Sequence, residues 1–305
     1  MISDIRFGED NGFWARPLLS KKELLRRETE LEKNGHKILA VVEGTCFDAT
    51  MTLGLEPMGS GEWSKNALRA EKTHRVATGR GTVVAILDHM FDAEDPSLKD
   101  RTVKPGSVLE GAPVFDPETS AGHGTWMAED LVRIAPGVQI MPVRFCGRGR
   151  YGDPDLYIAG IKYAVENGAD IVSISHQPIP EEKQEDFDRA VEKAVERGVT
   201  VVYIHYRGRR KDVVVTKPIE FAPFYKGEEN IHVIGTNFIK NSSFPYTWGG
   251  SPTAPIVSGV IAMMKEVNPG LKPVEIRKIL LNSGRPISSD CQILDAFQAV
   301  KNSRR

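Results

Sequence analysis

The most informative stretch of this chain is Gly249-Gly250-Ser251-Pro252-Thr253-Ala254-Pro255-Ile256-Val257-Ser258-Gly259-Val260-Ile261-Ala262-Met263-Met264, an apolar run bounded by Asn268-Pro269-Gly270. The pattern predicts a buried helix with Ser251 at its N-cap and Pro252 at its first position. Most serines at this place only cap a helix. The functional alternative is a hydroxyl at the positive end of the helix dipole, beside unpaired backbone N–H groups that can stabilise an oxyanion.

The rest of the main body alternates short β-branched runs with helical patterns from about Trp63 onward. This alternation is typical of βαβ units and predicts an α/β fold, a doubly wound, mostly parallel sheet with helices on both faces. We expect strands over 82–87, 139–145, 170–175, 200–205 and 232–235, and helices over 154–167 and around 187–195. In such sheets, ligands and chemistry gather at the carboxyl ends of the strands.

A small N-terminal α+β extension is expected ahead of this sheet. Ser20-Lys21-Lys22-Glu23 is a capping box for a helix that ends at Asn34-Gly35, and 37–42 and 47–53 are candidate strands. Met58-Gly59-Ser60-Gly61 is the best linker candidate, which predicts domains at 1–61 and 62–305. The extension is either a prodomain-like segment that inhibits or assists folding, or a packing extension of the core.

Composition narrows the class of protein. With 305 residues, of which 40% are apolar, the chain can bury one large core. Its 40 basic and 41 acidic residues nearly cancel, so no nucleic acid and no membrane is expected as a partner. Three distant cysteines, Cys46, Cys146 and Cys291, do not suggest a disulfide framework. Without a signal-peptide pattern or a long apolar run, we expect a soluble, cytoplasmic protein.

Two further residues carry chemistry in combination with Ser251. Asp88 directly follows the first expected strand, where it can be a turn residue or can hold an imidazole in one tautomer. His123 stands between Gly122 and Gly124 where a helix begins, a place that structural histidines also occupy. The order Asp, His, Ser is one of the three unrelated chain orders that build a serine-protease triad.

The chain resembles the subtilisin-like serine proteases, or subtilases, over about 63–299. The similar segments, in chain order, are 79–98 around Asp88, 123–128 around His123, 134–138, 160–164 with 170–175, the serine motif of Ser251, Pro255, Val257 and Gly259, and the C-terminal segments 268–281 and 293–296. The resemblance implies that Ser251 attacks a peptide carbonyl, His123 takes and returns the proton, and Asp88 orients His123. It implies a serine endopeptidase that works through an acyl-enzyme.

The chain departs from this family around the expected oxyanion hole. Arg207 stands where the family has an asparagine, so Arg207, or next Tyr206, is the expected donor to the oxyanion. His89 and Met90 replace the small residue and the glycine that follow the aspartate. The short stretch 129–134 leaves no room for the family's common calcium loop, so no metal and no cofactor is expected.

The substrate-binding strand and its neighbouring loops also depart from the family. His176 and Gln177 follow Ser175 where the family has glycines, which implies altered peptide contacts and narrow specificity. The substrate-binding candidates are Ser175, His176, Gln177, Cys146, Arg148 and Arg150. The two arginines are either solvated loop charges or the source of a preference for acidic substrates.

Other functions remain open. Gly147-Arg148-Gly149-Arg150-Tyr151-Gly152 spells a dinucleotide fingerprint, but the next strand does not end in the acidic residue which that site requires. The altered cleft is also compatible with a catalytically impaired binding or scaffold protein of the same fold, or with a peptide-maturation acyl transferase. The expected partner is a peptide or protein substrate, and the oligomeric state is unknown from the sequence.

Overall fold

The computed structural model describes residues 68–115, 122–146, 153–176, 178–204, 206, 208, 210–218, 231–233, 251–288 and 291–304. The predicted N-terminal extension, with its helix and two strands, lies outside these residues, and so do Gln177, Arg148, Arg150 and Arg207. The proposed boundary at residue 61 stays a prediction.

A seven-stranded sheet in the order β2-β3-β1-β4-β5-β6-β7 forms the centre of the protein, and every pairing in it is parallel. The strands are β1 Val83–Asp88, β2 Gly106–Ser107, β3 Gln139–Arg144, β4 Ile171–Ile174, β5 Thr200–Tyr203, β6 Val214–Pro218 and β7 Ile231–Val233. The predicted doubly wound α/β fold is confirmed, and the five expected strands are present within two residues at each end. β2 and β6 were not expected, because β2 has only two residues and β6 contains a lysine and a proline.

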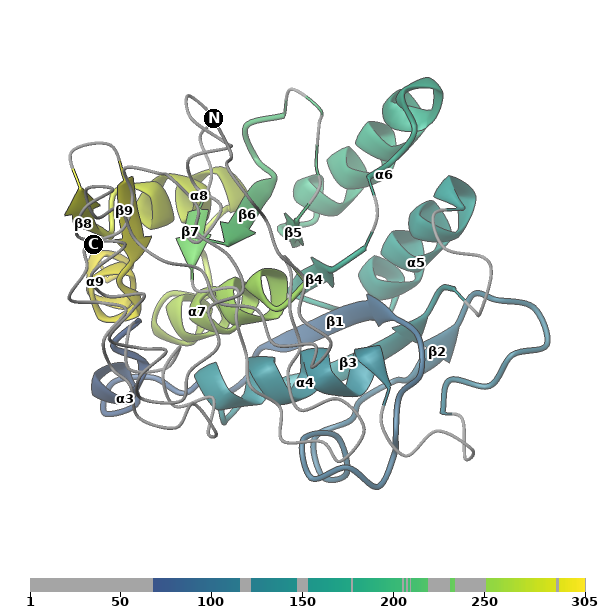
Figure 1. Cartoon of the computed structure of the whole chain (residues 1–305), viewed down its shortest axis with the longest axis horizontal. Coiled ribbons are helices and arrows are strands. Elements are labelled where there is room, and N and C mark those ends of the chain that lie inside the picture. The colour runs from purple at the N-terminus through teal and green to yellow at the C-terminus, as the bar shows by residue number, and fades with distance from the viewer. Residues whose placement is uncertain are drawn as a thin grey trace, which may run out of the picture.

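Helices cover both faces of this sheet (Figure 1). They are α3 Ala70–Thr73, α4 His123–Ile134, α5 Pro154–Glu166, α6 Gln184–Glu196, α7 Thr253–Val267, α8 Pro273–Leu281 and α9 Ala296–Asn302, with a C-terminal hairpin of β8 Gly284–Ser288 and β9 Cys291–Leu294. Figure 1 shows α5 and α6 on one side of the sheet and α4 and α7 on the other. None of the described helices is both long enough and apolar enough to cross a lipid bilayer.

The apolar helix predicted from the serine stretch is α7, and every residue from Thr253 to Lys265 in it is buried. Its first residue is Thr253 and its N-cap is Pro252, so the prediction that Ser251 occupies the N-cap is wrong by one position. The difference is one residue at a helix end: Pro252 has the helical dihedral angles φ −62° and ψ −21°, and its carbonyl accepts the bond from the Ile256 N–H. Ser251 therefore precedes the helix, and its hydroxyl donates to the Ser175 carbonyl instead of capping α7.

The helices α4 and α7 pack closely at Gly259. A Cβ atom at this position would lie 2.9 Å from both Cβ and Cγ2 of Ile134, which is closer than ordinary packing permits. The absence of a side chain at Gly259 thus lets the helix that begins at His123 approach the helix that follows Ser251.

Glu266, near the end of α7, holds the turn that leads into β1. One oxygen of its carboxylate accepts hydrogen bonds from the backbone N–H groups of Thr78, Gly79 and Arg80, at 2.6, 2.6 and 3.0 Å. Gly79 has a φ of +88°, a conformation in which glycine is unstrained. This carboxylate therefore joins the helix behind Ser251 to the strand that ends in Asp88.

Replacing Glu266 with alanine is expected to lower the free energy of unfolding by about 2–3 kcal/mol, because it removes charge-assisted hydrogen bonds from three backbone donors. Urea denaturation followed by circular dichroism measures this change. Glu185→Ala is the matched control, since the Glu185 side chain is 94% exposed and its ion pair with Arg189 spans 3.9 Å. A loss for Glu266→Ala no larger than that for the control would contradict the assignment.

Candidate active site

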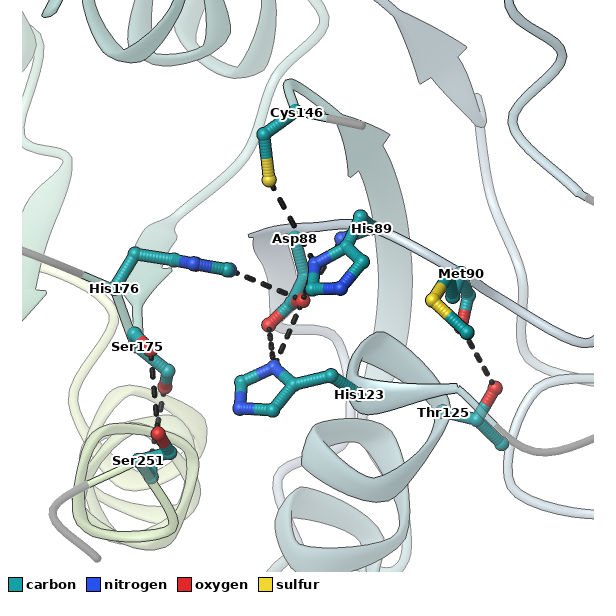
Figure 2. Close-up of polar contacts among 9 residues, drawn as sticks. All are labelled: Asp88, His89, Met90, His123, Thr125, Cys146, Ser175, His176 and Ser251. Carbon is teal, nitrogen blue, oxygen red and sulfur yellow. Dashed lines mark hydrogen bonds and ion pairs between the residues drawn. The ribbon is translucent and has the colours of Figure 1, made fainter. Parts of the chain in front are cut away.

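Asp88 is the last residue of β1, at the carboxyl end of the sheet, and its side chain is fully buried. Its two carboxylate oxygens lie 2.9 and 2.8 Å from Nδ1 of His123 (Figure 2). The backbone N–H of His89 donates to Oδ1 at 2.8 Å. The carboxylate is thus fixed from two sides and can hold the His123 ring in the tautomer that carries its proton on Nδ1.

His123 is the first residue of α4. Close packing explains why the residues on both sides of it are glycines. The Gly124 N–H donates to the carbonyl of His89 at 2.9 Å, and a Cβ atom on Gly124 would lie 2.6 Å from the Phe91 ring and 2.8 Å from that carbonyl. A Cβ atom on Gly122 would overlap the backbone of Met90. The start of α4 is therefore pressed against the segment after β1, which sets His123 against Asp88.

Gly124→Ala is expected to slow the reaction of Ser251 with a fluorophosphonate by about 10–100-fold, because displacing a catalytic group by about 1 Å costs roughly this much. The rate is measured by intact mass against time. Gly270→Ala is the control, since the nearest atom to its added Cβ would be Asn268 Oδ1 at 3.5 Å. If Gly124→Ala reacted as fast as the control variant, close packing at Gly124 would not position His123.

Ser251 lies immediately before α7 and is held against the end of β4 by two contacts with Ser175. The Ser175 hydroxyl donates to the Ser251 carbonyl at 2.8 Å, and the Ser251 hydroxyl donates to the Ser175 carbonyl at 3.4 Å. A hydrogen bond of 3.4 Å is long and weak. The three residues predicted to form the triad thus come to one region of the sheet edge, with the Ser251 hydroxyl directed at Ser175 in this structure (Figure 2).

Two further imidazoles face Asp88. Nδ1 of His89 and Nε2 of His176 each lie 3.1 Å from Asp88 Oδ1, and both side chains are buried. The His89 and His123 rings stack with centroids 5.7 Å apart, and the His176 centroid lies 5.3 Å from that of His123. The sequence marked His89 only as a departure from the family and His176 only as a substrate-binding candidate. One feature of the sequence could have pointed to both histidines as site residues: each closely follows the end of an expected strand.

Asp88 and His123 each shift the pKa of the other so that its charged form is favoured. Burial by itself would raise the pKa of Asp88, but the electrostatic interactions with His123 and His176 and the hydrogen bond from His123 hold it well below its ordinary value. Burial would lower the pKa of His123, yet the negative charge of Asp88 and its hydrogen bond raise the pKa above its ordinary value, with a smaller contribution from Asp130. Asp88 is therefore an anion at every pH at which His123 titrates.

Of the other described candidates, Cys146 and Tyr206 are both buried. The Cys146 sulfur lies 3.6 Å from Nδ1 of His89, and burial raises the pKa of this thiol, so that it stays neutral. The Tyr206 hydroxyl donates to Asp188 on α6 at 3.0 Å and accepts from the Arg210 N–H. Tyr206 can donate to an oxyanion only after it releases Asp188, and this contact does not favour it for that role.

The donor atoms of Asp88, His89, His123 and His176 all lie within 4.8 Å of one another. Such a group has the size and the ligand types of a metal site. The expectation that the chain binds no metal came from the shortened calcium loop, and it did not consider these nitrogen donors.

Comparison with known proteins finds a matching family profile and individual relatives. The profile of the Subtilase family matches residues 79–215 and 208–298. Fervidolysin from Fervidobacterium pennivorans is 28% identical over 270 residues, which cover 68% of this chain and 38% of that protein. Subtilisin Savinase from Lederbergia lenta is 25% identical over 257 residues, covering 74% of this chain and 92% of that protein.

A similar architecture is found among solved structures. A structure reported as proteases from Pseudoalteromonas arctica PAMC 21717 superposes with a TM-score of 0.64 and 21% sequence identity, and covers 81% of this chain and 98% of that one. At this level of identity the likeness concerns the fold. The match of the family profile, by contrast, includes Asp88, His123 and Ser251 within its bounds.

Proposed function

This chain belongs to the subtilase family, and on that premise we propose that it is a serine endopeptidase that cleaves peptide bonds through an acyl-enzyme on Ser251. The observation that carries the proposal is the buried Asp88 carboxylate 2.8 Å from Nδ1 of His123, at the same sheet edge as Ser251. The substrate is a peptide or protein, and the proposed setting is the cytoplasm. No nucleic acid or membrane partner is proposed.

In this mechanism the Ser251 hydroxyl turns from the Ser175 carbonyl to Nε2 of His123. His123 accepts the proton as Oγ attacks the peptide carbonyl, and Asp88 stabilises the imidazolium without accepting a proton itself. The tetrahedral intermediate collapses when His123 returns this proton to the leaving amine. A water molecule, deprotonated by the same imidazole, then hydrolyses the ester and regenerates the Ser251 hydroxyl.

Stabilisation of the developing oxyanion is assigned to two sources. The N-terminus of α7 places the positive end of a helix dipole next to Ser251. Arg207 is the proposed side-chain donor, with Tyr206 second. His176 and Gln177 stand where the family has glycines, so the sequence of the peptide-binding strand differs from the family's, and we propose narrow specificity for that reason.

The rate of the Ser251 reaction is expected to rise with pH through the pKa of His123, because only the neutral imidazole accepts a proton. Since Asp88 raises this pKa, the midpoint should lie above the ordinary histidine value of about 6.5. Asp88 stays ionised over this range and adds no second step. Labelling rates between about pH 5 and pH 9, in metal-free buffer, measure the profile. A midpoint below the ordinary value, or a flat profile, would contradict the role given to Asp88.

One observation favours a second candidate, a binding or scaffold protein that has lost peptidase activity. The Ser251 hydroxyl donates to the Ser175 carbonyl, an arrangement that leaves the nucleophile unactivated if it persists when a peptide binds. The two candidates differ in a single property, which is whether bound peptides are covalently processed.

The test is incubation of the purified protein with a peptide library made from a cell proteome, in water enriched in oxygen-18, with Ser251→Ala as the control. Mass spectrometry should find new carboxyl termini that carry the heavy oxygen, and none with the variant. Peptides joined to an added amine would indicate acyl transfer instead. Bound but uncut peptides would favour the scaffold.

A further inference from the structure

The Oδ1 atom of Asp88 has more nitrogen neighbours than it can accept hydrogen bonds from. They are the backbone N of His89 at 2.8 Å, Nδ1 of His123 at 2.9 Å, Nδ1 of His89 at 3.1 Å and Nε2 of His176 at 3.1 Å. A carboxylate has about four lone-pair sites over its two oxygens, roughly two on each. Not all four nitrogens can donate to this one atom, so a ring nitrogen that does not donate turns its own lone pair toward an anion.

His176 shows the consequence most directly. Its side chain is only 7% exposed, and within the described part of the chain Nε2 makes no hydrogen bond of acceptable geometry although it lies 3.1 Å from Oδ1. A buried nitrogen without a partner carries a desolvation cost that no hydrogen bond offsets. A cation between the imidazoles and the carboxylate would remove both this cost and the repulsion between lone pairs and anion.

From this geometry we infer that Asp88, His89, His123 and His176 form a binding site for a divalent transition-metal ion, with Zn²⁺ as the best fit. Three imidazole nitrogens and one carboxylate oxygen are a common four-ligand set for Zn²⁺, whereas Ca²⁺ and Mg²⁺ prefer sites made of oxygen. The donor atoms lie within 4.8 Å of one another. The widest of these separations must shorten by about 1.5 Å to reach the roughly 3.3 Å between ligands of a tetrahedral Zn²⁺ site.

Occupation of this site and catalysis exclude each other. The nitrogen of His123 that faces Asp88 is Nδ1, so binding the ion there requires the ring proton to move from Nδ1 to Nε2. In that tautomer Nε2 carries a proton and cannot accept the one on Ser251, and Asp88 binds the ion in place of the ring N–H. The ion would therefore act as a reversible inhibitor that locks the wrong tautomer, a change that costs about 10⁴-fold in a related triad.

Direct binding is measured on the full chain carrying Ser251→Ala, so that the result does not depend on catalysis. Titration with Co²⁺ should give the visible absorption bands of a four-coordinate nitrogen-rich site at a stoichiometry of one ion per chain, and Zn²⁺ should abolish them. Mg²⁺ and Ca²⁺ should not compete. His89→Gln and His176→Gln, each in this background, should weaken Zn²⁺ binding by about 10–100-fold or more.

His74→Gln is the matched control, since this imidazole is bonded to the Ile134 carbonyl and lies outside the cluster. Equal Zn²⁺ affinity in the control and in both cluster variants, with all of them folded by circular dichroism, would overturn the inference. So would the absence of any bound Co²⁺ or Zn²⁺ in the parent protein.

The second arm uses the protein with Ser251 intact. Saturating Zn²⁺ should slow fluorophosphonate labelling by at least about 100-fold, and a chelator should restore it. Labelling that continues at full rate with the ion bound would refute mutual exclusion. If the metal-free protein does not label at all, the proposed peptidase function fails, whereas the metal site still stands or falls by the binding titrations.

Discussion

Ser251→Ala is expected to hydrolyse peptides about 10⁶-fold more slowly than the unaltered protein, the loss that removal of the nucleophile causes in triads of this kind. The reason is that the variant lacks the oxygen that forms the acyl-enzyme, and the neighbouring Ser175 hydroxyl is already engaged with the backbone carbonyl of residue 251. The Ser251 side chain contributes little to folding, because its hydrogen bond to the Ser175 carbonyl is 3.4 Å long. The measurement is turnover of any peptide found to be cut by the unaltered protein.

Ser258→Ala is a matched control for this variant. Ser258 lies in α7, the helix that follows Ser251, is fully buried, and its hydroxyl has no hydrogen-bond partner among the described residues. Its replacement likewise removes one serine hydroxyl, here from α7, without touching the proposed triad, and turnover should stay within about two-fold. Similar losses in both variants would mean that damage to α7, rather than removal of a nucleophile, explains the effect.

Asp88→Asn is expected to lower turnover by about 10⁴-fold. An asparagine amide can donate to Nδ1 of His123, which places the ring proton on Nε2 and leaves no base facing Ser251. The variant also removes the negative charge that raises the pKa of His123. The residual rate should therefore show its pH midpoint shifted toward acid relative to the unaltered protein.

That shift separates a role in orienting His123 from general destabilisation, which would not move the midpoint. Asp155→Asn is the control, because the Asp155 side chain is 72% exposed and pairs only with Lys183 among the described contacts of its carboxylate. A loss below about ten-fold for Asp88→Asn, or an unchanged midpoint, would contradict the assignment of Asp88.

Much of the fold could be predicted from local pattern. The β-branched runs of β1, β3 and β4 are buried on both faces, and α7 is apolar over most of its length, so their sequences carry a clear signal. β2 and β6 carry no such signal, since a two-residue strand and one with a lysine and a proline are set by their neighbours. The predicted start of α7 differs from the observed start by one residue, a difference that local sequence does not resolve.

The triad residues could be proposed from sequence, but the imidazole cluster around them could not. It depends on the register of two strands that are far apart in the chain: β1 and β4 pair with Leu87 beside Ile174. Continued by two residues, this register brings Asp88, the last residue of β1, and the following His89 next to Ser175 and His176. No local pattern records such a register.

The labelling of Ser251 tests the central claim most directly. Purified protein in metal-free buffer is treated with a fluorophosphonate and its intact mass is compared with those of Ser251→Ala and His123→Ala. An activated serine predicts one adduct on the unaltered protein and none on either variant. A folded, unaltered protein that takes up no adduct, also after removal of residues 1–61, or an adduct that persists in Ser251→Ala, would contradict the account.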